Sequence, residues 1–348
     1  MRGNEPALTF GPVPSRRLGR SLGINNIPPK TCSYSCIYCQ LGRTDTFASE
    51  RRQFYQPGQI FDAVKQRVRE CEDTGEVIDY LTFVPDGEPT LDSNLGRTLE
   101  ALKVLDIPLA VITNSSLLWD KTVRDDLKTA DFVSLKMDAA SPEVWRRMNR
   151  PHGQLDFEQV LEGVKAFGAG FGGEFVTETM LVEGVNDSER ELGATAEVIG
   201  HLQPAIAYIA VPTRPPAEGS ARPPSPETLL LATEVFRRRT TRVEYLIGHE
   251  GNAFAASGDI ERDLLSITAV HPMREDSVME LLRKNNADMA VVRSLVERGD
   301  LTETSYGGHT YFLRRFARGG IQTNDHIPKR CESSHWDSID KAERESFQ

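Results

Sequence analysis

The sequence predicts an α/β fold: a parallel sheet that closes or nearly closes into a β/α barrel, followed by a small winged-helix-like domain. The first observation is that short β-branched or aromatic runs alternate with helical patterns six times between residues 21 and 239. Such alternation implies parallel strands joined by right-handed crossovers, in a sheet that closes or nearly closes into a barrel. The second observation is a helix, a second helix and a Gly-tipped hairpin within residues 277–318.

The predicted strands are short and end in polar segments. They cover residues 21–27, 77–84, 108–113, 131–137, 175–182 and 205–211. Between and after them, apolar residues at helical spacing predict helices over 58–74, 91–105, 119–130, 157–167, 188–202 and 227–239. Residues 1–21, which contain Gly, Pro and several Arg, are expected to form an irregular lead-in.

Composition shifts along the chain suggest four regions. We expect a barrel domain over 1–240, a bridging segment over 241–276, a winged-helix-like domain over 277–318 and a disordered polar tail over 319–348. A chain of 348 residues is long enough for one large or two unequal domains.

Composition also narrows the class of protein. Hydrophobic residues make up 39% and charged residues 26%, which is ordinary for a soluble globular protein. No secretory signal pattern begins the chain, and no run approaches the ~20 apolar residues of a membrane helix. We therefore expect a cytoplasmic protein with no membrane partner. The net charge of −10 argues against broad coating of nucleic acid, although a local basic face remains compatible with it.

Three of the five cysteines lie within eight residues. Cys32, Cys36 and Cys39 are spaced C-x3-C-x2-C. Thiolates select zinc or iron–sulfur clusters, and a structural zinc site takes four protein ligands. The next cysteine is Cys71, on the apolar stripe of a predicted helix, where a buried inert thiol is expected. A cubane held by three thiolates would leave one iron open. Zinc with a distant fourth ligand, or three core cysteines, are the alternatives at this point.

Two polar turns follow the next two predicted strands. Asp86-Gly87-Glu88-Pro89-Thr90 follows the strand at 77–84. Gly87 permits close backbone approach, and Glu88 places a carboxylate suited to an ammonium group at the strand end. Asn114 and Ser115 end the following strand, with short donors and acceptors that suit ribose hydroxyls. By themselves, these segments also fit an ordinary β-turn and a helix-capping turn.

Three further residues are candidates for catalysis or substrate binding. Lys136 and Asp138 are two residues apart at a strand end, so they share one face. If that face points inward, they form a buried charged pair, which suggests function but also fits a structural salt bridge. Arg214 follows the last predicted strand and suits an anion clamp.

The cysteine spacing, with Tyr38 before Cys39, resembles the radical S-adenosylmethionine (SAM) superfamily. Residues 13–44 resemble its subgroup of archaeal wyosine synthases and related bacterial Fe–S oxidoreductases. The resemblance implies a partial (β/α)6 barrel of the radical SAM type. It also implies that Cys32, Cys36 and Cys39 hold a [4Fe–4S] cluster whose open iron binds SAM. It further implies reductive cleavage of SAM to a 5′-deoxyadenosyl radical, which abstracts hydrogen from a substrate. That substrate is unidentified, a tRNA nucleoside being one candidate, and the electron donor is of the ferredoxin or flavodoxin type.

The same resemblance assigns roles to the strand-end residues. Gly87 and Glu88 match a Gly-Gly-Glu-Pro motif that binds the SAM amino group, with Asp86 standing at the first glycine. Asn114 or Ser115 would contact the ribose, Tyr38 would flank the adenine, and Lys136 would approach the SAM carboxylate. Wyosine synthases carry a second, N-terminal cysteine cluster. Residues 1–31 contain no cysteine, so the resemblance does not extend to that activity.

The C-terminal region supports a second hypothesis. Residues 277–318 hold seven Arg or Lys against five Asp or Glu, a mildly basic segment in an acidic protein. Such a segment suits RNA contact through the second helix and the hairpin, and it equally suits a protein dock or a lid. The alternative function is therefore an Fe–S and SAM-binding regulator or redox sensor, associated with nucleic acid and without turnover.

Overall fold

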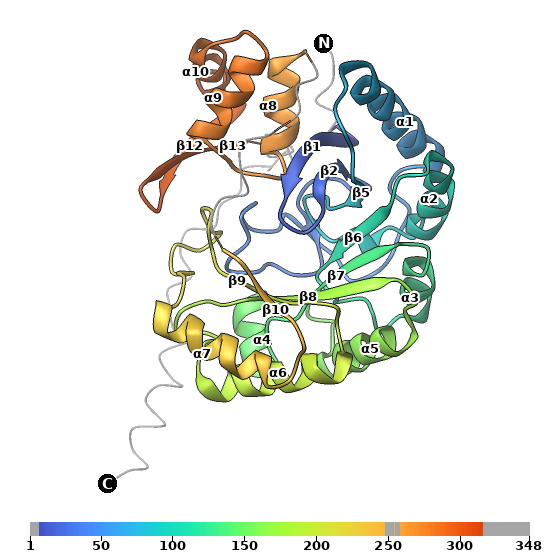
Figure 1. The fold of residues 1–348 in the computed structure, drawn as a ribbon, viewed down its shortest axis with the longest axis vertical. Helices are drawn as coiled ribbons and strands as arrows, with labels where there is room; N and C mark the ends of the chain where they lie inside the picture. The colour runs from blue at the N-terminus through green and yellow to red at the C-terminus, as the bar shows by residue number, and fades with distance from the viewer. Residues whose placement is uncertain (1–6, 248–253, 255–257, 316–348) are drawn as a thin grey trace, which may run out of the picture. The chain divides into compact units, whose positions relative to one another are not determined.

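The computed structural model describes residues 7–247, 254 and 258–315, and its central element is a single curved sheet of eight strands. Its order is β1-β2-β5-β6-β7-β8-β9-β10 (Figure 1). Neighbours pair in parallel from β2 to β10, whereas β1 pairs antiparallel with β2. The strands are β1 (Thr9–Ser15), β2 (Gly19–Ile24), β5 (Tyr80–Phe83), β6 (Leu109–Thr113), β7 (Phe132–Lys136), β8 (Glu174–Met180), β9 (Ala207–Ala210) and β10 (Val243–Leu246).

The predicted strands correspond to β2 and β5 to β9, so the α/β class with a parallel sheet is confirmed. The irregular lead-in is wrong for Thr9–Ser15, which form β1. Gly11 and Pro12 resemble a turn in the sequence, but here they lie at a register shift in the β1–β2 ladder. At the other edge, β10 pairs with β9 beyond residue 240, and the domain boundary placed at that residue stays a prediction.

Helices cover the outer face of the sheet (Figure 1). Their N-terminal caps are encoded locally: Asp156, for example, accepts a hydrogen bond from the Gln159 amide at the start of α5. The short α4, capped by Ser141, was not predicted. The helices of the barrel are α1 (Pro57–Thr74), α2 (Leu95–Leu102), α3 (Lys121–Leu127), α4 (Pro142–Asn149), α5 (Phe157–Gly170), α6 (Glu189–Leu202) and α7 (Pro226–Arg237).

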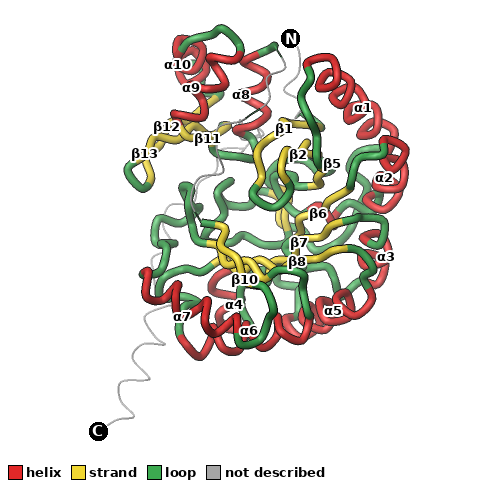
Figure 2. The backbone as a smooth tube through the Cα atoms, viewed as in Figure 1, coloured by secondary structure: helices red, strands yellow, loops and turns green. Residues whose placement is uncertain are grey.

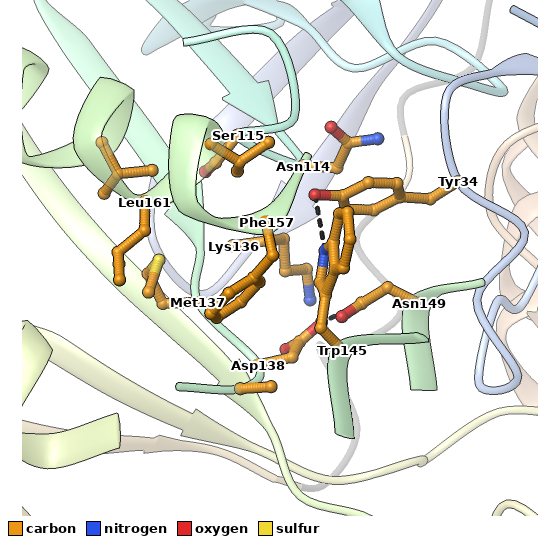
Figure 3. A pocket seen from close by; sticks show the side chains of 13 residues that line it. Tyr34, Asn114, Ser115, Lys136, Met137, Asp138, Trp145, Asn149, Phe157 and Leu161 are labelled. Atoms are coloured by element: carbon orange, nitrogen blue, oxygen red, sulfur yellow. Dashed lines mark hydrogen bonds between the residues drawn. The ribbon is translucent and has the colours of Figure 1, made fainter. Parts of the chain in front are cut away.

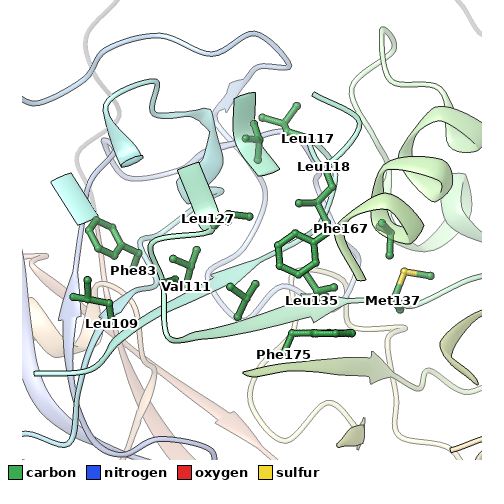
Figure 4. Close-up of a cluster of buried hydrophobic side chains, with 14 of the residues drawn as sticks. Phe83, Leu109, Val111, Leu117, Leu118, Leu127, Leu135, Met137, Phe167 and Phe175 are labelled. Atoms are coloured by element: carbon green, nitrogen blue, oxygen red, sulfur yellow. The ribbon is translucent and has the colours of Figure 1, made fainter. Parts of the chain in front are cut away.

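Alternation along the strands sorts side chains between two faces. Leu109, Val111 and Leu135 point outward and pack with Leu127 and Phe167 of the covering helices (Figure 4). Intervening residues point into the barrel; an inner cluster contains Ala110, Phe132, Val176, Tyr208 and Leu246. Lys136 continues the inward parity of Phe132, which places its side chain inside the barrel. Cys71 is buried on α1, as expected.

Among the described residues after β10 are three helices and a small antiparallel sheet of order β11-β13-β12 (Figure 2). Their hydrophobic cluster also includes Phe10 and Val13 of β1, so this region shares a core with the barrel edge. The winged-helix assignment stays a prediction, and the expected disordered tail lies outside the described residues. The elements are α8 (Ile260–Thr268), β11 (Met273–Arg274), α9 (Glu275–Lys284), α10 (Met289–Glu297), β12 (Leu301–Tyr306) and β13 (His309–Arg314).

Within the described part of the chain, no helix has the length and apolar character needed to cross a bilayer.

Candidate functional site

The three clustered cysteines line one pocket at the C-terminal ends of the strands. The pocket has an empty volume of about 760 Å³, open solvent included. Glu88, Asn114 and Lys136 line it as well, and they come from the ends of β5, β6 and β7. The structure therefore brings together the cysteine, turn and strand-end residues that the sequence singled out. In a β/α barrel this end of the strands is where chemistry occurs.

The cysteine loop begins at β3 (Thr31–Cys32), which pairs with β4 (Thr46–Phe47), and is held in place by the end of α4. The Ile37 amide donates to the Met148 carbonyl at 2.9 Å, and the Ser35 amide to that of Asn149 at 3.0 Å. The Asn149 side-chain amide also lies 3.5 Å from Cys36 Sγ. An N–H donor near a sulfur ligand stabilises its thiolate form. Sequence analysis missed Asn149, because a lone Asn in a short helix carries no recognisable signal.

The chemistry of the donor set fits an iron–sulfur cluster. Burial raises the pKa of all three thiols. For Cys36 the pKa rises to about 12, and the nearby Asp138 carboxylate contributes to that rise. Because thiols bind metal as thiolates, iron binding here must release protons. Across the described residues, no three His, Cys, Asp or Glu side chains lie in an arrangement that could hold a single metal ion. A [4Fe–4S] cluster does not need ligands that meet at one ion, because each of its three thiolates would bind a different iron.

Gly87 allows the turn after β5 to pass directly against the start of the cysteine loop. Its φ is +149°, and an added Cβ would lie 1.8 Å from the Thr31 carbonyl oxygen. The next amide, of Glu88, donates to the same oxygen at 3.1 Å. Since Thr31 precedes Cys32, the conformation of Gly87 fixes the height of the cysteine loop above the strand ends.

Glu88 is buried, with a relative exposure of 1%, and its two carboxylate oxygens differ in their partners. Oε1 accepts from the Thr90 amide, the Thr90 hydroxyl and the Thr113 hydroxyl, whereas Oε2 accepts from the Asn114 amide at 2.7 Å. Burial raises the pKa of this carboxyl, and these hydrogen bonds oppose the rise. An ionised carboxylate offers about four acceptor positions, so Oε2 retains capacity for a further donor such as an ammonium group.

The expected ribose contacts, Asn114 and Ser115, have different surroundings. The Asn114 side-chain amide donates to Ser33 Oγ at 2.9 Å and lies 3.5 Å from Cys32 Sγ, so it braces the cysteine loop. Ser115 has a φ of +68° and is buried. Its hydroxyl has no hydrogen-bond partner within the described residues, and neither does Asp86 Oδ2 beside the cysteines. Unpaired polar atoms in a pocket are what a bound polar ligand would satisfy.

Lys136 and Asp138 interact electrostatically on the same inner face, but the direct ion pair of Lys136 is with Glu178. Lys136 and Glu178 are direct neighbours in the β7–β8 register, and Arg17 binds the other oxygen of Glu178. Burial lowers the pKa of Lys136, whose ammonium lies 5.3 Å from the centroid of the Tyr38 ring. These contacts could not be predicted from the sequence, because Arg17 and Glu178 lie on segments that are distant from Lys136 in the chain.

Asp138 is held by three donors of its own. Its Oδ2 accepts from the Tyr38 hydroxyl and, at 2.8 Å, from the Asn149 side-chain amide. Its Oδ1 accepts from the Met180 backbone amide at 2.9 Å. The carboxylate thus orients Tyr38 and Asn149, which both adjoin the cysteines. This environment suits a positioning residue better than a proton-transfer group.

Figure 3 shows a second, tighter pocket, whose empty volume of about 360 Å³ includes open solvent. It shares Tyr34, Asn114 and Lys136 with the first pocket. The Trp145 indole donates to the Tyr34 hydroxyl at 2.9 Å, and Phe157 packs on Trp145 at 5.4 Å between ring centroids. Ser115 and Asp138 supply polar atoms to walls that are otherwise largely apolar.

The Arg17–Glu178–Lys136 triad gives a first prediction, on stability. Glu178→Ala would leave two partly buried cations without their shared partner, and we expect a loss of about 3–5 kcal/mol in the free energy of unfolding. Glu162→Ala breaks an exposed pair with Lys165 and should cost less than about 1 kcal/mol. Denaturant unfolding measures both variants, and equal losses would contradict a structural role for the triad.

Arg214 lies in a different cavity. Its guanidinium donates to Gln40 Oε1 at 2.7 Å and lies 3.0 Å from His271 Nε2. Gln40 follows Cys39 directly, so Arg214 reaches the cysteine loop through a single side chain. The structure therefore separates Arg214 from Lys136 and Asp138, with which it was grouped as a catalytic candidate.

Several cations of the C-terminal region are engaged in local contacts. Arg283 pairs with Glu280 at 2.7 Å, and Arg298 pairs with Glu261 at 2.9 Å. The Lys284 ammonium donates to the Phe254 carbonyl at 2.7 Å. RNA contact through the second helix and the hairpin stays a prediction, and these pairs reduce the charge available to it.

Comparisons with known proteins identify the family. The chain is 44% identical over 309 residues to a UPF0026 protein of Methanocaldococcus jannaschii, covering 88% of this chain and 96% of that one. The chain belongs to the UPF0026 family. Residues 26–193 match the family described as "Radical SAM superfamily", so the protein is a radical SAM enzyme whose substrate is undetermined. Membership of this superfamily implies a [4Fe–4S] cluster and SAM.

Two solved structures are also similar to the protein. A radical SAM methyltransferase from Sphaerobacter thermophilus is 17% identical, with a TM-score of 0.48 and coverage of 66% of this chain and 67% of that one. A structure of TYW1 with a bound lysine–pyruvate adduct is 11% identical, with a TM-score of 0.40 and coverage of 85% and 80%.

Proposed function

We propose that the protein cleaves SAM reductively at a [4Fe–4S] cluster held by Cys32, Cys36 and Cys39. One observation carries the proposal: the three thiols share a single strand-end pocket with Glu88, Asn114 and Lys136. When bound there, the cluster and SAM would supply a 5′-deoxyadenosyl radical for hydrogen abstraction from a substrate. The roles of the protein are to hold both groups, orient them and exclude water.

The polar groups of the two adjoining pockets suit the parts of SAM. Glu88 Oε2, with one internal donor, would accept from the SAM ammonium group. The unpaired Ser115 hydroxyl would bond a ribose hydroxyl, and the Tyr38 ring, which lines the larger pocket with the cysteines, would flank the adenine. Lys136 lines both pockets and would meet the SAM carboxylate. Asn114 and Asp138 act through their neighbours, the first on the cysteine loop and the second on Tyr38.

The proposal is tested by measuring 5′-deoxyadenosine and methionine after a one-electron reductant is added to cluster-loaded protein with SAM. Formation of both products above a control without protein is the expected result. If SAM perturbs the electron paramagnetic resonance signal of the reduced cluster but is never cleaved, the protein would instead be a binding regulator. No perturbation and no product would contradict the proposal altogether.

A second prediction concerns Glu88. Glu88→Gln removes the charge that would bind the SAM ammonium while keeping the size of the side chain. We expect SAM affinity to fall by about 10–150-fold, corresponding to the ~1.5–3 kcal/mol of one charge-assisted contact, with the iron content unchanged. Equilibrium titration with SAM measures the change. Glu72→Gln, at an exposed site on α1, is the matched control. Equal affinities in the two variants would remove Glu88 from the SAM site.

A further inference from the structure

A cavity lined by Arg214 lies between the segment after β9 and the β12–β13 hairpin. It has an empty volume of about 1310 Å³, open solvent included. Its lining includes Pro212 and Thr213 on the barrel side and Tyr306 and Tyr311 on the hairpin side. None of these residues lines the cysteine pocket, so the cavity is a separate compartment of the described chain.

Positive charge is concentrated in this cavity. Three guanidinium groups line it, from Arg214, Arg222 and Arg274, together with the imidazoles of His271 and His309. Among the described residues that line it, Glu183 is the one carboxylate, and Asp276, which lies outside the lining, accepts two hydrogen bonds from Arg274. This local excess occurs in a protein whose net charge is −10. Guanidinium groups match phosphate in both charge and geometry, which favours a phosphorylated ligand over a neutral one.

Two tyrosines form fixed walls beside the arginines. The Tyr306 hydroxyl donates to the Pro212 carbonyl and the Tyr311 hydroxyl to the Thr213 carbonyl, both at 3.1 Å. Burial raises the pKa of both phenols, so they stay neutral donors. Anchored at the hydroxyl, each ring is held in place before any ligand arrives. Fixed aromatic rings next to guanidinium groups suit a ligand with a planar ring and an anionic group.

We propose that this cavity binds a phosphorylated ligand of the nucleotide class. Arg214 and Arg222 contact the phosphate, and the tyrosines border the base. Arg214 also donates to Gln40, the residue after Cys39, so the bound nucleotide lies one side chain away from the cysteine loop. The inference goes beyond the proposed SAM chemistry and does not depend on it, because it rests only on the cavity and its charges.

Isothermal titration calorimetry of the full chain, with and without SAM, tests the proposal. The probes are guanosine and uridine 5′-monophosphates, the two nucleosides and inorganic phosphate. We expect saturable binding of at least one nucleotide, at least tenfold tighter than its nucleoside or phosphate alone. Arg222→Gln, at an exposed residue, should weaken that binding by about tenfold or more. Arg69→Gln, at an exposed site on α1, should leave it unchanged.

Several results would overturn the proposal. One is that the nucleotide binds no more tightly than its nucleoside or than inorganic phosphate. Another is that Arg222→Gln binds the nucleotide as tightly as the wild type does. A third is that SAM displaces the nucleotide. The last would place the nucleotide in the cysteine pocket instead.

A final arm compares a short single-stranded RNA with the mononucleotide. Tighter binding of the RNA, still lost in Arg222→Gln, identifies a nucleic acid as the source of the phosphate. Tighter binding of the mononucleotide identifies a free metabolite. Because SAM cleavage is assayed separately, either proposal can fail without the other.

Discussion

Cys36→Ala is expected to lose most of the iron found in the anaerobically purified wild type, and to form no 5′-deoxyadenosine. The wild type should hold about four irons per chain, the content of one [4Fe–4S] cluster. The Cys36 thiol shares the strand-end pocket with Cys32 and Cys39, and the Asn149 amide lies 3.5 Å from its sulfur. With two thiolates left, a second iron would lose its protein ligand and the cluster would become labile. Iron and sulfide analysis, with the absorption spectrum, measures the loss.

The matched control for this variant is Cys71→Ala. Cys71 is 1% exposed and lies on the buried face of α1 with Val64 and Val68. Its replacement removes a small buried side chain, so stability can fall, but the iron content should equal that of the wild type. Equal iron in the wild type and Cys36→Ala would contradict the cluster assignment. If both cysteine variants lost the same amount of iron, the loss would be a general consequence of destabilisation and not of removing a ligand.

The second large effect is expected from Gly87→Ala. Alanine would place its Cβ 1.8 Å from the Thr31 carbonyl oxygen and 2.8 Å from Ile27 Cδ1, at a φ of +149° that side chains rarely tolerate. The clash lies against backbone, so it cannot be relieved by rotating a side chain. The turn and the cysteine loop must separate, and we expect destabilisation on the order of 3 kcal/mol together with poor cluster incorporation. Thermal unfolding and iron content report the two effects.

Gly58→Ala provides the comparison for Gly87. A Cβ at Gly58 meets no atom within 4 Å, and the residue lies in the first turn of α1. Stability there should change by less than about 0.5 kcal/mol, with full iron content. If Gly87→Ala behaved like Gly58→Ala, the turn after β5 would not control the height of the cysteine loop.

Local sequence patterns determined the central sheet and the main motif residues. Each of the strands β2 and β5 to β9 is a short apolar run followed by a polar turn, and both signals lie within about ten residues. Because parallel strands end at the same edge, placing Glu88, Asn114 and Lys136 at strand ends was enough to predict that they meet. The spacing of the cysteines is likewise local, and it indicates the superfamily that residues 26–193 match.

Contacts between segments that are distant in sequence were decided only by the tertiary structure. Arg17, Lys136 and Glu178 form one triad because β7 and β8 pair in a particular register and the turn before β2 reaches over them. Asn149 reaches Cys36 from α4, across 113 residues of sequence. The positively charged cavity likewise needs the β12–β13 hairpin to meet the segment after β9. Register and packing are set by the whole core, and no local pattern of residues encodes which distant partner a side chain meets.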